Sequence, residues 1–134
     1  MDKLSDKIVK LRLETRRICM CEGEKSTATM TIKTKALYLI QNNITPNEII
    51  NTLNIAKTNL AILAHDMINE GLIIKKTNLN DKRQISYSIT PKGQMELNQK
   101  LSIIENRIKK VTNEKEYNEQ LKKFDELLNF LSFI

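Results

Sequence analysis

A helix-start signature at Thr45-Pro46-Asn47-Glu48 constrains the fold of this chain more than any other feature. The Thr45 hydroxyl can accept a hydrogen bond from the backbone N–H of Glu48, and the Glu48 carboxylate can accept one from the N–H of Thr45. Pro46 takes the first helical position, where its missing N–H costs nothing. A new helix therefore begins here, and its apolar residues are Ile49, Ile50 and Leu53.

A second helix is predicted over residues 56–70, after a break at Asn54-Ile55. Gly71 ends it, because glycine adopts the positive φ that closes many helices. Two strands follow at 72–76 and 84–89, and in the second, apolar and polar residues alternate with a period of two. The polar turn 77–83 joins them into a hairpin. This order of helix, turn, helix and hairpin is that of a winged helix-turn-helix.

The remaining segments are predicted to be helical, since the chain has only three Gly and two Pro in 134 residues. Apolar stripes at helical spacing occur in residues 2–20, 31–42, 90–111 and 115–134. The expected fold class is mainly α with a small β-hairpin, a winged helix-turn-helix with N- and C-terminal dimerisation helices. The expected organisation is an N-terminal dimerisation helix and connector (1–30), a DNA-binding domain (31–93) and C-terminal dimerisation helices (94–134).

The helix over 56–70 is the candidate DNA-recognition element, because the major groove is wide enough for one α-helix. At 100° per residue its core-facing residues are Leu60, Leu63, Ala64 and Met67. The opposite side carries Thr58, Ile62, His65 and Asn69, with Asn59 and Ala61 at its flanks. An asparagine can pair with the edge of adenine, a threonine can serve several bases, and an isoleucine can lie against a thymine methyl group. Lys57, at the helix start, suits a phosphate. Thr45 and His65 are also counted among the candidate DNA contacts.

Each of these residues also has a simpler explanation. Thr58, Asn59 and Asn69 can be ordinary solvated side chains, and Ile62 can pack against the base of the hairpin. His65 is expected to be an exposed side chain and not a metal ligand, because the chain has no second His. Lys82 and Arg83, at the hairpin tip, can protect a sheet edge, although arginine also suits a narrow minor groove.

Taken in this order, the segments resemble the MarR family of winged-helix regulators from about Thr31 to Gly93. The resemblance is carried by the segments 45–50, 53–60, 68–73, 80–83 (Asn-Asp-Lys-Arg) and 89–93 (Ile-Thr-Pro-Lys-Gly). It implies a homodimer formed by the terminal helices, a recognition helix that starts near Ala56, and a wing whose Arg83 reaches the minor groove. It also implies that Asp81 holds the wing and that DNA is released by a small ligand, an oxidant or a metal. Ala56 and Ile62 depart from the family pattern.

The net charge of +6 favours a polyanionic partner such as nucleic acid. The terminal apolar stripes expose more surface than one small domain can cover, which favours a homodimer over a monomer whose terminal helices fold back on its own core. No apolar run approaches the roughly 20 residues of a membrane span, so no membrane partner is expected. The low cysteine content favours the cytoplasm.

Cys19 and Cys21 are the candidate redox residues, and a Cys-x-Cys pair can also bind a soft metal, but two reduced thiols near a helix end are the expected state. A thiol sensor needs a lowered pKa and access to solvent. No cofactor or bound metal is expected. The sequence also has no glycine-rich phosphate loop and no nucleophile–base spacing, so no enzymatic activity is expected.

Two functions remain open. The first is a sequence-specific double-stranded DNA-binding transcription regulator that acts as a homodimer on a pseudo-palindromic operator, and the resemblance implies that it is a repressor. The second is an interaction module that uses the winged helix to bind protein or RNA without sequence-specific DNA readout. A steep dependence of duplex affinity on salt favours the first function.

Overall fold

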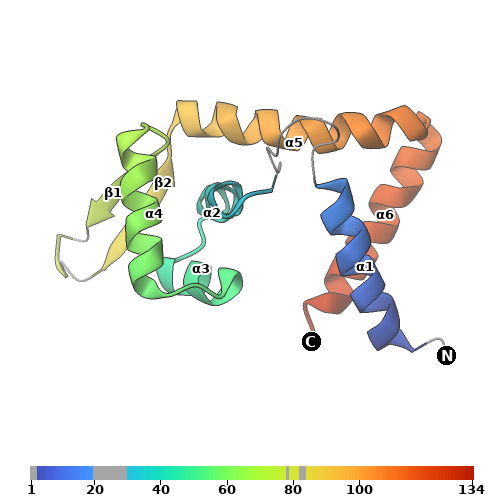
Figure 1. Cartoon of the computed structure of the whole chain (residues 1–134), viewed down its shortest axis with the longest axis horizontal. Coiled ribbons are helices and arrows are strands. Elements are labelled where there is room, and N and C mark those ends of the chain that lie inside the picture. The colour runs from blue at the N-terminus through green and yellow to red at the C-terminus, as the bar shows by residue number, and fades with distance from the viewer. Residues whose placement is uncertain (1–2, 20–29, 78, 82–83) are drawn as a thin grey trace.

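The computed structural model describes residues 3–19, 30–77, 79–81 and 84–134. These residues form six helices and one antiparallel hairpin (Figure 1). The elements are α1 (Leu4–Ile18), α2 (Ile32–Gln41), α3 (Pro46–Leu53), α4 (Lys57–Asn69), β1 (Ile73–Thr77), β2 (Ile85–Ile89), α5 (Pro91–Val111) and α6 (Glu114–Leu131). The predicted winged helix-turn-helix with terminal helices is confirmed.

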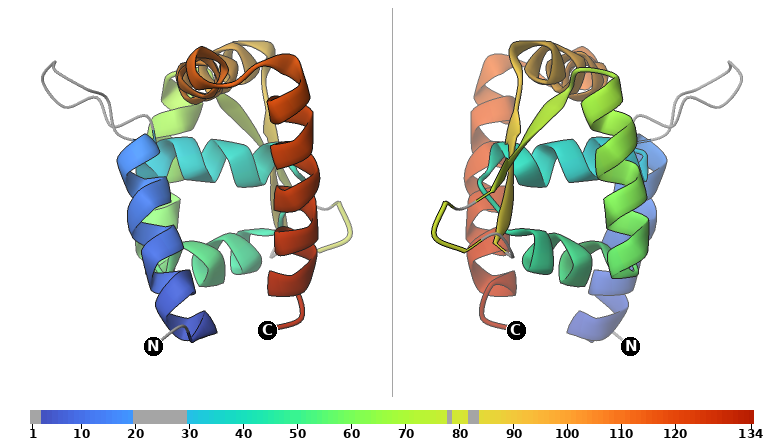
Figure 2. Two further views of the ribbon diagram at one scale, coloured as in Figure 1. Left: turned by 90° about the vertical axis from the view of Figure 1, so that its right-hand side faces the viewer. Right: turned by 90° about the vertical axis from the view of Figure 1, so that its left-hand side faces the viewer.

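The molecule has two parts joined by the long helix α5. The winged helix-turn-helix surrounds α2 at one end of α5, and α1 and α6 descend at the other end (Figure 1). Although α1 and α6 overlap in Figure 1, they stand apart when the molecule is turned (Figure 2). Neither helix contains a buried residue. The terminal helices therefore do not fold back on the core, which rules out that alternative within one chain.

The hydrophobic core lies entirely in the winged helix-turn-helix and the first two turns of α5. Helix α2 supplies three of its buried side chains and α4 supplies another three, and Ile49 of α3 is fully buried. The complete set is Ala36, Leu37, Ile40, Ile49, Leu60, Ala64, Met67, Leu72, Ile73 and Leu97. Burial of each large aliphatic side chain contributes about 1.5–3 kcal/mol, so this cluster fixes how α4 is oriented.

The helix-turn-helix forms as its capping residues predict. The Glu48 N–H donates to the Thr45 hydroxyl at 3.3 Å, and the Thr45 N–H donates to the Glu48 carboxylate at 3.4 Å. Asn54 ends α3 in the left-handed conformation with φ 53°, which asparagine tolerates better than most residues. Ala56 precedes α4 without a side-chain cap, so the first N–H groups of α4 lack an N-cap side-chain acceptor.

The first strand of the hairpin, β1, begins and ends one residue later than the sequence predicts. The first strand is Ile73–Thr77 instead of 72–76, and the second is Ile85–Ile89 instead of 84–89. The reason is that the backbone of Leu72 bonds outside the ladder: its N–H donates to Met67 and its carbonyl accepts from Thr90. Gly71 has φ +76°, as expected for a residue that ends a helix.

Gly93 allows the start of α5 to lie against the turn between α4 and β1. A Cβ atom added at Gly93 would be 2.1 Å from the carbonyl oxygen of Leu72, which is closer than any van der Waals contact. Thr90 holds the same junction, because its hydroxyl accepts from the Gly93 N–H at 3.0 Å and donates to the Gly71 carbonyl at 2.6 Å. This junction sets the direction in which α5 leaves the winged domain.

Within the described residues, no helix is both long enough and apolar enough to cross a membrane.

We expect Gly93→Ala to lower the free energy of unfolding by about 1–3 kcal/mol, the usual range for an overpacked site. The new methyl group meets backbone, which cannot move aside as a side chain can. Chemical denaturation of the variant and the parent would measure the difference. Gly71→Asn is the matched control, because an added Cβ there meets only the Lys92 side chain at 3.8 Å and asparagine tolerates positive φ. A Gly93→Ala variant as stable as the parent would contradict the tight junction.

Candidate nucleic-acid interface

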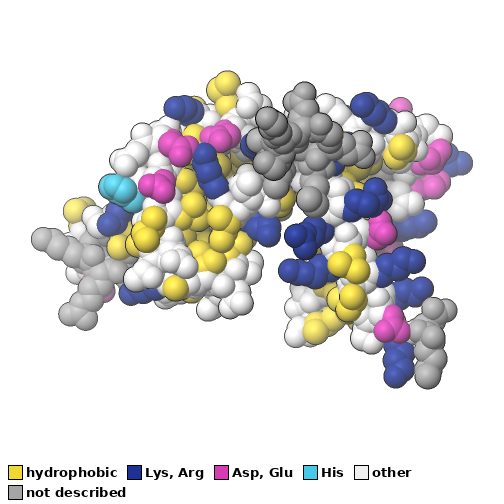
Figure 3. Space-filling model, viewed as in Figure 1, with side chains coloured by type: hydrophobic (Ala, Val, Ile, Leu, Met, Phe, Trp, Pro, Cys, Tyr) yellow, Lys and Arg dark blue, Asp and Glu magenta, His cyan; other side chains and the backbone are white. Residues whose placement is uncertain are grey.

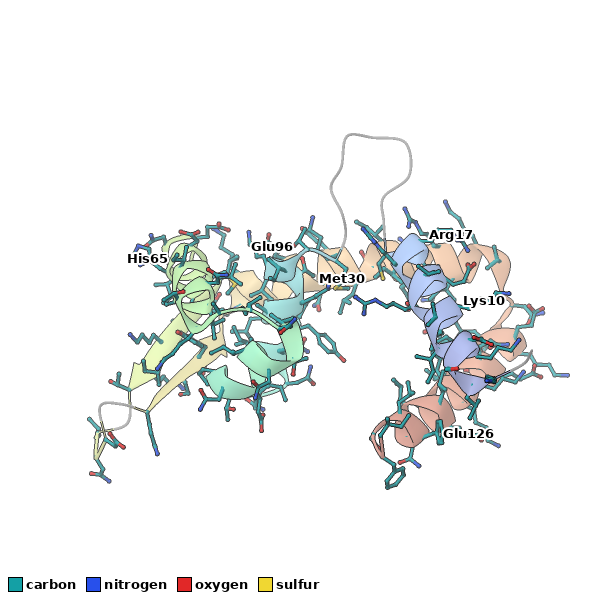
Figure 4. The ribbon with its side chains drawn as sticks, turned by 60° about the horizontal axis from the view of Figure 1, so that its bottom comes forward. Lys10, Arg17, Met30, His65, Glu96 and Glu126 are labelled. Carbon is teal, nitrogen blue, oxygen red and sulfur yellow. The ribbon has the colours of Figure 1, made fainter. Side chains whose placement is uncertain are left out.

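Helix α4 presents one continuous exposed side. Thr58, Asn59, Ile62, His65 and Asn69 are all exposed, and Ile62 keeps 63% of its surface accessible. The chain's single histidine, His65, lies at the outer edge of the winged domain (Figures 3 and 4). The helical-wheel assignment of the outward side is therefore confirmed. Contact with the hairpin base cannot account for Ile62, since most of its side chain faces solvent.

The opposite side of α4 is anchored in the core. Leu60, Ala64 and Met67 are buried, and Leu63 is half-buried. The two sides lie about half a turn apart on one rigid helix. Burial of the inner side therefore determines which residues face outward.

A charged cluster holds the C-terminal end of α4. The Lys33 ammonium lies 2.6 Å from the Glu70 carboxylate and 3.3 Å from that of Glu96, which joins α2, α4 and α5. Lys92 adds a hydrogen bond of 2.8 Å to the Glu70 carbonyl. Burial acts to lower the pKa of Lys33, but the two carboxylates outweigh it and raise that pKa. The cluster couples the orientation of α4 to that of α5.

A groove runs beside the N-terminal turn of α4, between the start of α3 and the hairpin. Polar and cationic side chains line it: Asn43, Thr45, Asn47, Lys57, Lys76, Thr77, Gln84, Ser86 and Ser88. Tyr87 also lines it, and burial raises the pKa of its hydroxyl. Thr45 and Lys57, two of the candidate DNA contacts, therefore face one shared groove together with Lys76.

The tip of the hairpin lies partly outside the described residues. Asp81 is exposed, and its backbone carbonyl accepts from the Gln84 N–H at 3.0 Å. Lys82 and Arg83, the two predicted wing-tip contacts, are not among the residues that the structure describes.

The terminal helices carry large apolar side chains that no other described residue covers. The most exposed on α1 are Leu4 at 66%, Leu13 at 61% and Val9 at 60%. Those on α6 include Leu121, Phe124 and Leu128, which are spaced to form a stripe. Figure 3 shows the apolar side chains of α1 in yellow on the side facing the viewer.

Two side chains fix the terminal helices to α5. Arg107 donates a hydrogen bond of 2.5 Å to the carbonyl of Ile18, at the end of α1. The Tyr117 hydroxyl of α6 donates to the Glu105 carboxylate, and that bond raises the pKa of Tyr117. Cys19 follows α1 directly and is half-buried, whereas Cys21 lies outside the described residues.

A cavity of about 700 Å³ lies where α1 approaches the winged domain. Its lining combines cationic, aromatic and aliphatic residues from α1, α2, α3 and α5: Arg12, Met30, Ile32, Lys35, Tyr38, Leu39, Thr52, Leu53, Asn54 and Leu101. The volume is within the range of small-molecule sites, about 300–1,000 Å³. Sequence reasoning did not find these residues, because they come together only when α1 is placed against α2.

Sequence reasoning also missed Lys76 and Gln84 in the groove beside α4. The signal was present, because Lys76 pairs with Ser86 across the hairpin, and side chains on one face of a strand pair lie together. Placing that face beside Lys57, however, required the packing of the hairpin against the body.

Comparison with solved structures finds close matches in fold. The chain matches the multiple antibiotic resistance repressor MarR with a TM-score of 0.68 and 18% identity, over 98% of this chain and 96% of that one. It matches the transcriptional regulator Tm0710 from Thermotoga maritima with a TM-score of 0.67 and 18% identity, over 98% and 96% of the two chains. The match to BldR, a transcriptional regulator from Sulfolobus solfataricus, has a TM-score of 0.63 and 19% identity over the whole of both chains.

Neither the protein-family models nor the curated proteins contain a match. The likeness is thus one of structure, and it covers the terminal helices as well as the winged domain. This chain has the winged-helix fold of the MarR-type transcriptional regulators.

Proposed function

We propose that this chain is a MarR-family regulator that binds double-stranded DNA in a sequence-specific manner and acts as a homodimeric repressor on a pseudo-palindromic operator. The observation that carries the proposal is the exposed, uncovered side of α4 beside a groove that contains Lys57 and Lys76. In helix-turn-helix proteins the second helix enters the major groove and its N-terminal residues contact the base edges. Here those residues include Thr58, Asn59 and Ile62.

The groove beside α4 suits the phosphate backbone. Lys57 and Lys76 supply positive charge, and the hydroxyl and amide groups around them can bond phosphate oxygens. Thr45 at the start of α3 is exposed on the same side. The N-terminal end of α4 adds backbone N–H groups and a favourable dipole. We assign residues 31–93 to duplex binding, with Asp81, Lys82 and Arg83 of the wing as further contacts.

We expect the affinity of the chain for its preferred duplex to fall steeply with salt, because each neutralised phosphate releases a counterion. Lys57→Ala should reduce the slope of log affinity against log salt by about two, one for each protomer of the dimer, and should weaken binding to all sequences alike. Thr58→Ala should instead cost about 1–3 kcal/mol at one base position and relax the preference there. Fluorescence anisotropy on duplexes selected from a random pool would measure both.

A protein- or RNA-binding module predicts a different outcome. In that case no duplex is preferred over the pool and the salt slope for duplex DNA is close to zero. Lys115→Ala, on α6 and far along the chain from the groove, is the matched control, and its slope should equal that of the parent.

The terminal segments, residues 1–30 and 94–134, are assigned to dimerisation, with the apolar sides of α1 and α6 as the contact surface and the winged-domain end of α5, which includes Met95, outside it. Their apolar side chains are uncovered, and a second copy offers the same surface, as a twofold interface requires. Each Leu or Ile that becomes buried contributes about 1.5–3 kcal/mol. A twofold dimer presents two α4 helices to the duplex, with half-sites about 34 Å apart.

We expect the double variant Leu121→Asp/Leu128→Asp to be monomeric in sedimentation analysis and to lose about a hundredfold in operator affinity, since the second binding event is no longer intramolecular. Both residues are more than half exposed in the single chain, so its fold should survive, which circular dichroism would check. Met95→Asp, which alters an equally exposed apolar residue of α5, should leave the dimer intact. A dimeric double variant would contradict this assignment.

We further propose that the cavity between α1 and the winged domain takes a small effector. Arg12, Lys35 and Tyr38 together suit an aromatic anion, and Leu39, Leu53 and Leu101 supply an apolar wall. Because α1 and α2 both line the cavity, an occupant would influence how the terminal helices meet the winged domain. Thiol oxidation at Cys19 and Cys21 remains the other candidate signal.

We expect benzoate, a small aromatic anion, to bind the parent protein and to weaken its operator binding. The double variant Arg12→Gln/Lys35→Gln should bind benzoate at least tenfold more weakly, which corresponds to about 1.4 kcal/mol. Isothermal titration calorimetry would measure both affinities. Lys10→Gln, which removes another α1 cation that does not line the cavity, is the control. Equal benzoate affinity in the parent and the double variant would argue against the site.

A further inference from the structure

The exposed side of α4 has an unusual chemical character for a surface that meets DNA. The helix contains no arginine, and its single lysine is its first residue. Lys57 lines the groove shared with Thr45 and Lys76, so its ammonium lies toward the phosphate-binding side. The donors that pair best with the O6 and N7 atoms of guanine are arginine and lysine. The exposed side beyond Lys57 contains neither.

The residues on the exposed side of α4 favour contacts with adenine and thymine instead of guanine. Asn59 has an amide that can pair with the N6 and N7 atoms of adenine, and Ile62 and Ala61 present methyl groups. Ile62 is 63% exposed, and an apolar side chain of that size on a polar surface gains most from an apolar partner. In the major groove the only apolar feature of a base pair is the methyl group of thymine.

The polar residues further along α4 do not change this preference. The Asn69 amide nitrogen lies 3.2 Å from Nε2 of His65, so these two side chains bond to each other. Asp66 is the one exposed acid that suits cytosine, but it lies two helical turns beyond Thr58. The N-terminal residues of a recognition helix are the ones that contact base edges.

Resting on the proposed function, we infer that the first two turns of α4 select A·T base pairs, with an adenine at Asn59 and a thymine methyl group against Ile62. The central prediction concerns one chemical group. Deoxyuridine pairs as thymidine does but lacks the 5-methyl group, so its substitution removes the methyl contact and leaves base pairing unchanged.

The test begins with selection of preferred duplexes from a random pool by the full-length dimer. We expect each half-site to contain consecutive A·T pairs where α4 lies. Replacing thymidine by deoxyuridine at each of these positions in turn should lower the affinity of the parent about fourfold at one position, the equivalent of one buried methyl group. Ile62→Ala, which removes the contact in both half-sites of the dimer, should bind the thymidine duplex about sixteenfold more weakly, two fourfold losses combined, and should no longer distinguish it from the deoxyuridine duplex.

A second arm addresses the adenine. Replacing adenine by 7-deazaadenine removes the N7 acceptor, which should weaken the parent at one position but leave Asn59→Ala unaffected. Met95→Ala is the matched control for Ile62→Ala, because Met95 is 64% exposed but belongs to α5. The Met95→Ala variant should bind the deoxyuridine duplex more weakly than the thymidine duplex, by the same factor as the parent.

The outcomes separate this inference from the proposed function. Selected half-sites with G·C pairs under α4, or an Ile62→Ala variant as sensitive to deoxyuridine as the parent, would overturn the A·T assignment while leaving DNA binding intact. No preference for any duplex would overturn both.

Discussion

The structure depends on the burial of one side of α4 in the hydrophobic core, beside α3 and the hairpin. Leu60, Ala64 and Met67 are all less than 4% exposed, and their burial leaves the opposite side of the same helix outward. The Lys33 cluster and the Gly93 junction then connect this orientation to α5. The proposed DNA-binding surface is in this sense a consequence of the core, because the outward residues are chosen by which residues pack inward.

The second physical feature is the uneven distribution of the core along the chain. All the fully buried large side chains lie between α2 and the first turns of α5, whereas α1 and α6 bury none. An exposed surface with this many leucine and phenylalanine side chains marks an interaction site. The partner proposed for it is a second copy of the chain, which would cover both terminal helices at once, and α5 connects that surface to the winged domain.

Most of the fold could be predicted from the sequence, because local signals and packing agree. The Thr45 capping box, the positive φ at Gly71 and the helix start at Thr90-Pro91 each fix an element boundary by hydrogen bonds within a few residues. The outward side of α4 followed from periodicity alone. The first strand was displaced by one residue, since Leu72 bonds to Met67 and Thr90 instead of to the ladder.

What could not be predicted arises from contacts between segments far apart in the chain. Lys33 pairs with Glu70 and Glu96, Arg107 bonds to Ile18, and Arg12 and Tyr38 line one cavity. Residue spacing in a single sequence does not predict these contacts, because they depend on how the helices pack against one another. Lys82, Arg83 and Cys21 stay as sequence predictions. Likewise, the base contacts of Thr58 and Asn59 remain proposals, because exposure shows only that these side chains are accessible.

The central claim is that the outward side of α4 lies in the major groove twice per assembly. Hydroxyl-radical footprinting of the dimer on its selected duplex tests it most directly. The account predicts two protected segments on one face of the duplex, with centres about 34 Å, or one helical turn, apart. A single protected segment, or two segments on opposite faces of the duplex, would contradict it.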